Sequence, residues 1–369
     1  MTLYMGLMSG TSMDGIDAVL LEIEDNGMRV AAAAARTWAP QLQRRLRRAA
    51  EQYQQLGLQE FGQLDTIVGT EFAEAAEQLL QASHVDPKTV RAIGSHGQTV
   101  LHQPRDSAPF TLQIGDPNVI AERLKIDVVA DFRRRDVAAG GEGAPLMPAF
   151  HVAAFGTAGQ YNAVVNIGGI ANVSLLHADG GATGFDTGPG NCLLDAWSRK
   201  QRGQPYDADG AWAASGSIHA PLLQKMLKDS YFSRPPPKST GRETFSDAWL
   251  DRALTGISAN SADVQATLCE LTARTIAAGV SAGGRPPACL MVCGGGAYNS
   301  HLTARLEVAL PRTQVQTTAA RGIDPQHVEA AGFAWLAYRY INNLPGNLPA
   351  VTGAKHLVPL GGLYRGAVS

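Results

Sequence analysis

The sequence lacks most of the patterns by which metal and nucleotide sites are identified on inspection. None of its four cysteines forms a C-x-x-C pair, and no two of its nine histidines stand four residues apart. Zinc ligation is therefore not expected, and neither is a metal site of the H-x-x-x-H kind. The chain contains no Gly-Lys dipeptide, which excludes a Walker A phosphate loop. We interpret the cysteines as small apolar residues of a reduced, cytosolic protein.

The chain also carries little net charge. The net charge is −2, and the one basic run consists of three arginines between two aspartates. A run this short does not predict a nucleic-acid site. No apolar stretch reaches the roughly 20 residues of a membrane helix, and the N-terminus has neither the basic segment nor the cleavage site of a signal peptide. We expect a soluble, cytoplasmic protein that binds neither nucleic acid nor membrane.

Glycine, in contrast, is abundant, with 40 of the 369 residues gathered in clusters. One cluster separates two apolar stretches, 3–8 and 16–23, and a second separates 163–166 from 171–176. In both halves of the chain this strand–turn–strand pattern is followed by alternating helical and strand patterns. Such alternation is typical of the α/β class, in which ligands bind at strand ends. We therefore predict one α/β architecture used twice, with a cleft between the two copies.

A chain of 369 residues is also long enough for about two domains. Long helices are predicted at 58–82, where apolar residues recur at near-helical spacing, and at 329–341 near the end of the chain. The predicted domains are residues 1–140 together with about 328–369, and residues 141–327.

The glycine-rich turns are candidate phosphate sites, because glycine lets backbone N–H groups converge on an anion and nearby hydroxyl groups add donors. The candidate residues are Gly10, Thr11, Ser12, Met13, Asp14, Gly15, Ile16 and Asp17 in the first turn, Gly168 and Gly169 in the second, and Gly294, Gly295 and Gly296 in the third. A plain β-hairpin with polar turn residues is the alternative interpretation of the first two turns. The third lacks the last glycine of the dinucleotide fingerprint, since Asn299 stands there.

Asp186 is the candidate catalytic base. It follows a predicted strand, 183–185, and precedes the turn-forming residues 187–190. A carboxylate presented above such a turn is able to accept a proton from an attacking hydroxyl group or water. The alternative is an Asx turn, in which the side chain bonds only to its own local backbone.

Three further features are candidates for substrate contacts. His96 lies in a predicted polar loop, 94–99, that follows a strand at 90–93. One of the arginines in 133–135 is suited to clamp a carboxylate, while the others are expected to face solvent. Glu329 opens the last long helix, where it either complements the helix dipole or reaches the cleft.

These motifs, taken in order, resemble those of the anhydro-N-acetylmuramic acid kinase family over essentially the whole chain. The matching segments are Gly10-Thr11-Ser12-x-Asp14-Gly15-x-Asp17, Ser95-His96-Gly97-Gln98-Thr99, Asp131-Phe132-Arg133-Arg134-Arg135-Asp136-Val137-Ala138, Asn166-Ile167-Gly168-Gly169-x-x-Asn172, Gly184-Phe185-Asp186-x-Gly188-Pro189-Gly190-Asn191, Lys238-Ser239-Thr240-Gly241-Arg242-Glu243 and Cys293-Gly294-Gly295-Gly296-Ala297-x-Asn299. Several of these segments are weak signals alone, and their order makes them specific.

The resemblance implies an actin-like fold, with two ribonuclease-H-like domains flanking an ATP cleft. It also implies that water opens the anhydro bridge of 1,6-anhydro-N-acetylmuramate while O6 takes the γ-phosphoryl group of ATP. The products would be N-acetylmuramate 6-phosphate and ADP, formed with Mg²⁺ in peptidoglycan recycling. A homodimer is what the family suggests. An ordinary sugar kinase of the same fold and an actin-like ATPase switch are the alternatives.

The resemblance also implies roles for the candidate residues. Asp186 would deprotonate the water, the three glycine turns would contact the ATP phosphates, and His96, Gln98, one arginine of the run Arg133, Arg134 and Arg135, and Glu329 would line the sugar side. One departure concerns magnesium: related kinases carry an aspartate where this chain has Met8. The metal would then fall to other carboxylates, with Asp14, Asp17 and Asp186 as candidates.

Overall fold

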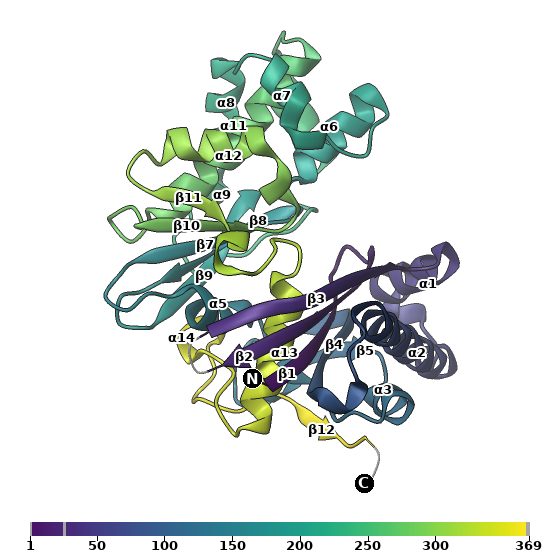
Figure 1. The fold of residues 1–369 in the computed structure, drawn as a ribbon. Helices are drawn as coiled ribbons and strands as arrows, with labels where there is room; N and C mark the ends of the chain where they lie inside the picture. The colour runs from purple at the N-terminus through teal and green to yellow at the C-terminus, as the bar shows by residue number, and fades with distance from the viewer. Residues whose placement is uncertain (1, 25–26, 367–369) are drawn as a thin grey trace. The chain divides into compact units, whose positions relative to one another are not determined.

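The computed structural model describes residues 2–24 and 27–366, so residue 1 and residues 367–369 of the predicted domain ranges lie outside the described residues. The chain divides into two compact units (Figure 1). Unit 1 contains residues 1–154, 321–323 and 327–369, and unit 2 contains residues 155–320 and 324–326. Residues 141–154 thus belong to unit 1, whereas the sequence predicts a domain boundary after residue 140. The reason is helix α5 (Met147–Phe155), whose Phe150 ring packs on Trp335 of unit 1.

The described residues of unit 1 form a seven-stranded sheet with β5 paired to β4 and the other strands in the order β12-β6-β4-β1-β2-β3. β1 and β2 are the predicted first hairpin and pair antiparallel, and β1 pairs with β4 in parallel. The edge strand β3 had no counterpart among the predicted elements. The strands are β1 (Thr2–Ser9), β2 (Gly15–Glu24), β3 (Gly27–Thr37), β4 (Val90–Gln103), β5 (Phe110–Ile114), β6 (Val128–Ala130) and β12 (Gly362–Tyr364).

Helices cover both faces of this sheet. The α-helices of unit 1 besides α5 are α1 (Pro40–Glu51), α2 (Leu58–Ser83), α3 (Pro117–Leu124), α4 (Phe132–Ala138), α13 (Val328–Ile341) and α14 (Pro349–Thr352). On β1, Met5 and Leu7 join a buried apolar cluster with residues of α2, among them Phe72. Side chains alternate along a strand, so Gly6 faces the other way, toward α13.

Glycine is required where α13 crosses the sheet. A Cβ atom at Gly6 would overlap the carbonyl oxygen of Ala330, and one at Gly94 would overlap that of Phe333. Both overlaps are with helix backbone, which cannot turn aside as a side chain can. The bare backbone of β1 and β4 therefore lets α13 lie directly against the sheet, which places Glu329, in the first turn of α13, close to it.

The segment 94–99 is a strand and not the predicted loop. β4 runs without interruption from Val90 to Gln103. It pairs with β1 as far as Gln98, and from Gln98 onward it pairs with β5. Polar and glycine residues in this stretch indicated a loop locally, but neighbouring strands on each side supply the hydrogen bonds that keep it extended.

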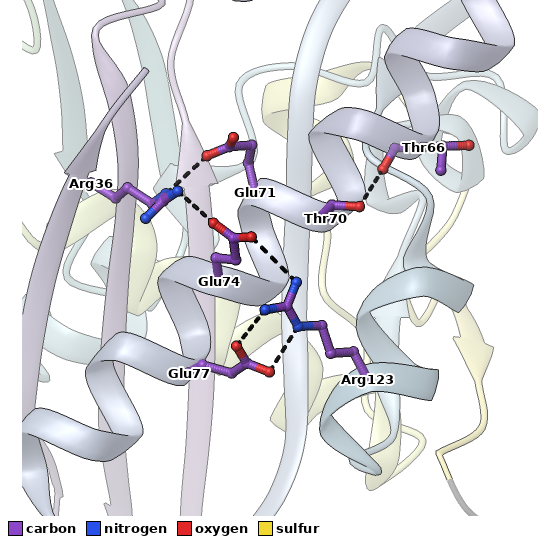
Figure 2. A network of polar contacts seen from close by, with 7 residues as sticks. All are labelled: Arg36, Thr66, Thr70, Glu71, Glu74, Glu77 and Arg123. Atoms are coloured by element: carbon purple, nitrogen blue, oxygen red, sulfur yellow. Dashed lines mark hydrogen bonds and ion pairs between the residues drawn. The ribbon is translucent and has the colours of Figure 1, made fainter. Parts of the chain in front are cut away.

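A network of ion pairs joins β3, α2 and α3 on the outside of unit 1 (Figure 2). Arg36 of β3 donates to Glu71 at 2.9 Å and to Glu74 at 2.5 Å. Arg123 of α3 donates to Glu74 and, through two nitrogens, to Glu77. Glu74 bridges the two arginines, so the pairs form one connected network. Its side chains are partly exposed, so we assign it a modest part in stability.

The described residues of unit 2 form a five-stranded sheet in the order β11-β10-β7-β8-β9. The predicted second hairpin is β7 and β8, and β10 pairs with β7 in parallel. The strands are β7 (Asn162–Ile167), β8 (Ile170–Leu176), β9 (Ala182–Pro189), β10 (Cys289–Cys293) and β11 (Gln314–Thr317). The α-helices are α6 (Cys192–Arg202), α7 (Ala211–Ser215), α8 (Ala220–Leu227), α9 (Ser230–Ser233), α10 (Asp247–Leu254), α11 (Ser261–Val280) and α12 (Ser300–Ala309).

The core of unit 2 lies between this sheet and its helices. The side of α11 that carries Leu268 and Ile276 is fully buried and shares one apolar cluster with Val165 of β7 and Phe185 of β9. None of the helices in the described part of the chain is long and apolar enough to cross a membrane.

Candidate active site

The first glycine-rich turn joins β1 to β2 and is held from behind by buried side chains. The Ser9 hydroxyl lies 2.6 Å from the carbonyl oxygen of Gly15 and 2.7 Å from Oε1 of Gln98. The amide nitrogen of Gln98 donates to the carbonyl oxygen of Gly10 at 3.2 Å. Gln98 is fully buried, and both polar atoms of its side chain contact the turn or the strand that precedes it. This observation favours a role for Gln98 in shaping the turn over a role in contacting sugar.

A second contact comes from helix α1. The Gln43 side chain donates to the carbonyl oxygen of Met13 at 2.8 Å. Met13 has a φ of 54°, a left-handed conformation that non-glycine residues rarely adopt. Its side chain is buried, as is that of Ile16, whereas Thr11 and Asp14 are exposed. Met13 and Ile16 therefore anchor the turn from inside, and a ligand would meet the backbone and hydroxyl groups of the exposed residues.

The three consecutive arginines differ sharply in their surroundings. Arg134 and Arg135 are exposed, and Arg134 lies 3.5 Å from Asp131. Arg133 points inward: its Nε donates to Nε2 of His96 at 2.9 Å, and its Nη1 donates to the carbonyl oxygen of Gly143 at 2.9 Å. A guanidinium group has five N–H bonds, so three of those on Arg133 take no partner among the described residues. Arg133 is thus the arginine of this run that is held within unit 1 and still has N–H bonds without a described partner.

His96 is the buried partner of this arginine. Burial, and then the charge of Arg133, lower the pKa of His96 well below its ordinary value. The imidazole is therefore neutral near pH 7, and Nε2 carries the lone pair that accepts from Arg133. The His96 ring also packs against that of Phe333 of α13, at a centroid distance of 4.6 Å and an interplanar angle of 36°. This geometry makes His96 a support for Arg133.

The carboxylates of Glu329 and Asp17, both in unit 1, interact electrostatically. Burial raises the pKa of Glu329, the charge of Arg133 opposes this rise, and the charge of Asp17 adds to it. Burial also raises the pKa of Asp17, which His327 opposes. Glu329 and Asp17 each cost free energy when ionised, and a cation close to both would lower that cost.

Asp186 lies within strand β9 of unit 2, whereas the prediction placed it at the end of a strand, just before a tight turn. β9 continues to Pro189 because its residues pair with β8, with Asp186 opposite Asn172. The main-chain N–H of Thr240 donates to Oδ2 of Asp186 at 2.9 Å, and the Tyr231 hydroxyl donates to the Asp186 carbonyl oxygen at 2.7 Å. Oδ1 accepts no hydrogen bond from the residues that the structure describes.

The environment of Asp186 suits a base. Burial raises the pKa of Asp186, and the N–H of Thr240 opposes this rise. A carboxylate with a raised pKa holds a proton more firmly than an exposed one, and a single anchored oxygen fixes its direction. The local Asx-turn interpretation has no support among the described contacts, since the donor to the carboxylate comes from a distant loop.

The second and third glycine turns converge within unit 2. The backbone N–H groups of Gly190 and Asn191 donate to the carbonyl oxygens of Gly169 and Gly168 at 2.9 and 2.8 Å. A Cβ atom at Gly190 would overlap the carbonyl oxygen of Gly168. Gly294, with a φ of 76°, lies against the side chain of Asn166 at the end of β7. The turns stack so closely that only glycine fits at these positions.

Several residues of the site escaped sequence reasoning. The loop of Lys238, Thr240 and Arg242 had no assigned role, yet it contacts both Asp186 and the second turn. A Cβ atom at Gly169 would lie 2.6 Å from Nε of Arg242, so the guanidinium group covers that turn. Asn191 also binds the turn region, since its amide donates to the carbonyl oxygen of Ile167 at 3.1 Å. The signal that was available is composition: a Lys-Ser-Thr-Gly-Arg segment in a loop is rich in donors.

The candidate residues fall into two groups, one in each unit. Unit 1 carries the turn Gly10–Asp17 together with His96, Gln98, Arg133 and Glu329. Unit 2 carries Asp186 with the turns 168–169 and 294–296. In the described part of the chain, no group of three histidine, cysteine or acidic side chains is arranged to hold a metal ion.

The sequence model of one protein family, Anhydro-N-acetylmuramic acid kinase, matches residues 2–366. The Anhydro-N-acetylmuramic acid kinase of Xanthomonas campestris pv. campestris (strain 8004) is 50% identical over 365 residues, which cover 98% of this chain and 97% of that protein. The enzyme of the same name from Vibrio cholerae serotype O1 is 49% identical over 364 residues, covering 98% of each chain.

Among solved structures, the activator of the 2-hydroxyisocaproyl-CoA dehydratase from Clostridium difficile, with bound ADPNP, has a TM-score of 0.50 at 13% identity. The match covers 92% of this chain and 96% of that one. At this identity the likeness concerns the fold alone, and it confirms the predicted α/β class with two ribonuclease-H-like domains. The family match is stronger evidence, because it extends over almost every residue. The chain therefore belongs to the anhydro-N-acetylmuramic acid kinase family, and it is a kinase.

Proposed function

We propose that this kinase opens 1,6-anhydro-N-acetylmuramate with water and transfers the γ-phosphoryl group of ATP to O6. The observation that carries the proposal is the setting of Asp186, a partly buried carboxylate. The N–H of Thr240 holds Oδ2 in place, which fixes the orientation of the group and leaves Oδ1 to accept a proton. The water oxygen bonds to the anomeric carbon as its proton passes to Asp186. The bond from the anomeric carbon to O6 breaks, and O6 takes the phosphoryl group as ADP leaves.

The other candidate residues supply binding. Backbone N–H groups and hydroxyls of Gly10–Asp17, together with the turns 168–169 and 294–296, would contact the ATP phosphates. Arg133 would bind the lactyl carboxylate of the sugar, because its unused N–H bonds form the planar pair that carboxylates accept. Arg134 and Arg135 are exposed and are not included in this proposal.

Magnesium fits the residues of unit 1 as a partner of the nucleotide. Asp17 is a partly buried carboxylate with a raised pKa, caused mainly by burial, and proteins commonly bind Mg²⁺ through one or two carboxylates and substrate phosphates. Asp17 would therefore hold the ion, which when bound neutralises phosphate charge. Asp14 is exposed on the turn, and Asp186 is assigned to proton transfer.

Isotope labelling tests the reaction directly. With purified enzyme, ATP and the anhydro sugar in ¹⁸O water, we expect one labelled oxygen at the anomeric position of the phosphorylated product. The physical reason is that the bridge opens by attack of water at that carbon. Mass spectrometry of the product measures the label. A phosphorylated product without it would point to an ordinary sugar kinase in which Asp186 deprotonates a substrate hydroxyl group.

The acidic limb of the pH profile reports on Asp186. We expect kcat/KM to fall as the pH drops through the raised pKa of Asp186, because the protonated acid cannot accept the proton of water. Thr240→Pro removes the N–H that lowers this pKa, so its acidic limb should lie at higher pH. Thr240→Val keeps the N–H and the shape of the side chain, and its limb should match the wild type. If the acidic limbs of the wild type and both variants lay at the same pH, the pH profile would not report on Asp186.

We also propose that the enzyme acts in the cytoplasm as a homodimer and serves peptidoglycan recycling. The support is the chemistry of the substrate, an anhydro sugar specific to bacterial cell-wall fragments, together with the family match. Sedimentation of the purified protein tests the dimer, and a monomer mass would contradict it.

A further inference from the structure

Asp136 of helix α4 is a fully buried carboxylate whose described hydrogen bonds all come from neutral donors. The main-chain N–H of Gly143 donates to Oδ2 at 2.8 Å. The amide of Asn347 and the hydroxyl of Thr352 donate to Oδ1 at 3.1 and 2.9 Å. Its exposed fraction is 0%, and no ion pair with it occurs among the described residues. Burying a carboxylate this way is costly, and three donors from separate segments offset the cost.

These bonds connect Asp136 to Arg133 through Gly143. Gly143 has a φ of 70°, and its N–H bonds to Asp136 while its carbonyl oxygen accepts from Nη1 of Arg133 at 2.9 Å. His96 holds the opposite side of the same guanidinium group. Displacement of Gly143 would therefore release one of the two contacts that orient Arg133. Asn347 and Thr352 extend the connection to the C-terminal segment, which also bonds to Glu142 through the Thr352 carbonyl oxygen at 2.7 Å.

We propose that Asp136 is a positioning residue that, through Gly143, orients Arg133 for the carboxylate of the sugar and so sets the preference for a carboxylate-bearing substrate. This inference rests on the proposed function of Arg133. Asp136 itself touches no substrate in this scheme. Its charge matters because the two carboxylate oxygens together accept from three donors. In an asparagine one of these oxygens becomes an NH₂ group, which donates and cannot accept.

The test compares two substrates in Asp136→Asn. One substrate is 1,6-anhydro-N-acetylmuramate, and the other is its carboxamide, which has the same size without the charge. We expect kcat/KM for the acid to fall about tenfold more than kcat/KM for the carboxamide, the worth of one well-placed charged hydrogen bond. The loss should appear in the KM for the sugar, with kcat and the KM for ATP within about twofold of the wild type.

A matched control is Asp207→Asn in unit 2. Asp207 also accepts from three neutral donors, the N–H groups of Trp212 and Ala213 and the amide of Gln265, but has no connection to Arg133. We expect Asp207→Asn to keep the wild-type ratio of kcat/KM for the two substrates, even if the substitution lowers its stability. An equal loss for both substrates in Asp136→Asn would overturn the inference, because it would mark a general structural role.

If Asp136→Asn does not fold, Thr352→Ala carries the test, since it removes one donor and leaves the carboxylate in place. We expect a smaller loss of substrate preference in the same direction, and an unchanged ratio would contradict the proposal. Failure of the proposed function looks different: the wild-type enzyme would then give either no phosphorylated product from the anhydro sugar or a product without the ¹⁸O label. The two failures are therefore distinguishable in one set of assays.

Discussion

Asp186→Asn is expected to lower kcat by about 10²–10⁴-fold, the usual contribution of a positioned general base. The substitution keeps the shape of the side chain, and its oxygen remains able to accept from the N–H of Thr240. The amide has no lone pair that takes a proton from water near pH 7, so the loss should fall on the chemical step. We expect the KM for ATP to change by less than about threefold. Initial rates of ADP formation at varied ATP and sugar concentrations measure both quantities.

Asp195→Asn is the matched control for this prediction. Asp195 is a second acidic residue of unit 2, in the first turn of α6, and burial raises its pKa to about 6, opposed by Arg199 and Arg242. By pKa alone it is also a possible base. Its backbone belongs to the helix that follows the glycine turn. Among the described residues no hydrogen bond holds its carboxylate as Thr240 holds that of Asp186, so we expect near-normal turnover. If Asp195→Asn lost more activity than Asp186→Asn, the assignment of the base would be wrong.

Gly6→Ala is expected to destabilise the protein by about 3 kcal/mol or more, at the upper end of overpacking substitutions. The added Cβ atom would overlap the carbonyl oxygen of Ala330 in α13. Because the obstacle is backbone, either the helix or the strand must move, and Glu329 moves with the helix. Urea unfolding followed by circular dichroism measures the change as a lower midpoint.

Gly62→Ala provides the opposite expectation in the same unit. Gly62 lies in α2, and a Cβ atom there would meet nothing within 4 Å. Alanine in a helix is favoured over glycine by up to about 1 kcal/mol, so the midpoint should stay or rise. An unfolding midpoint for Gly6→Ala equal to that of the wild type would show that α13 does not press on β1 as described.

Local patterns were sufficient for much of the fold. The helices predicted at 58–82 and 329–341 are α2 and α13, and both predicted hairpins form. These features depend on periodicity and turn chemistry within about 25 residues, which a single sequence contains. The segment 94–99 is the instructive failure. Its composition is that of a loop, but pairing with β1 and β5 overrides this local preference.

In the candidate site, too, some features follow from the sequence and others depend on the fold. The order of the glycine turns and of Asp186 along the chain was enough to indicate the family, and the comparisons confirm it. Sequence reasoning left the three arginines 133–135 equivalent. The tertiary structure separates them, because only the inward direction of Arg133 brings it to His96 and Gly143.

The sequence by itself therefore determined the two α/β halves, and it predicted phosphate contacts for the glycine turns and Asp186 as the base. Only the tertiary structure decided that Gln98 shapes the first turn, that Thr240 anchors Asp186 and that Asp136 lies buried behind Arg133. The physical reason is the range of the interactions. Turn and helix preferences act between near neighbours, whereas Ser9 and Gln98 are 89 residues apart, and Asp136 and Thr352 are 216 apart. Such contacts exist only after the chain has folded.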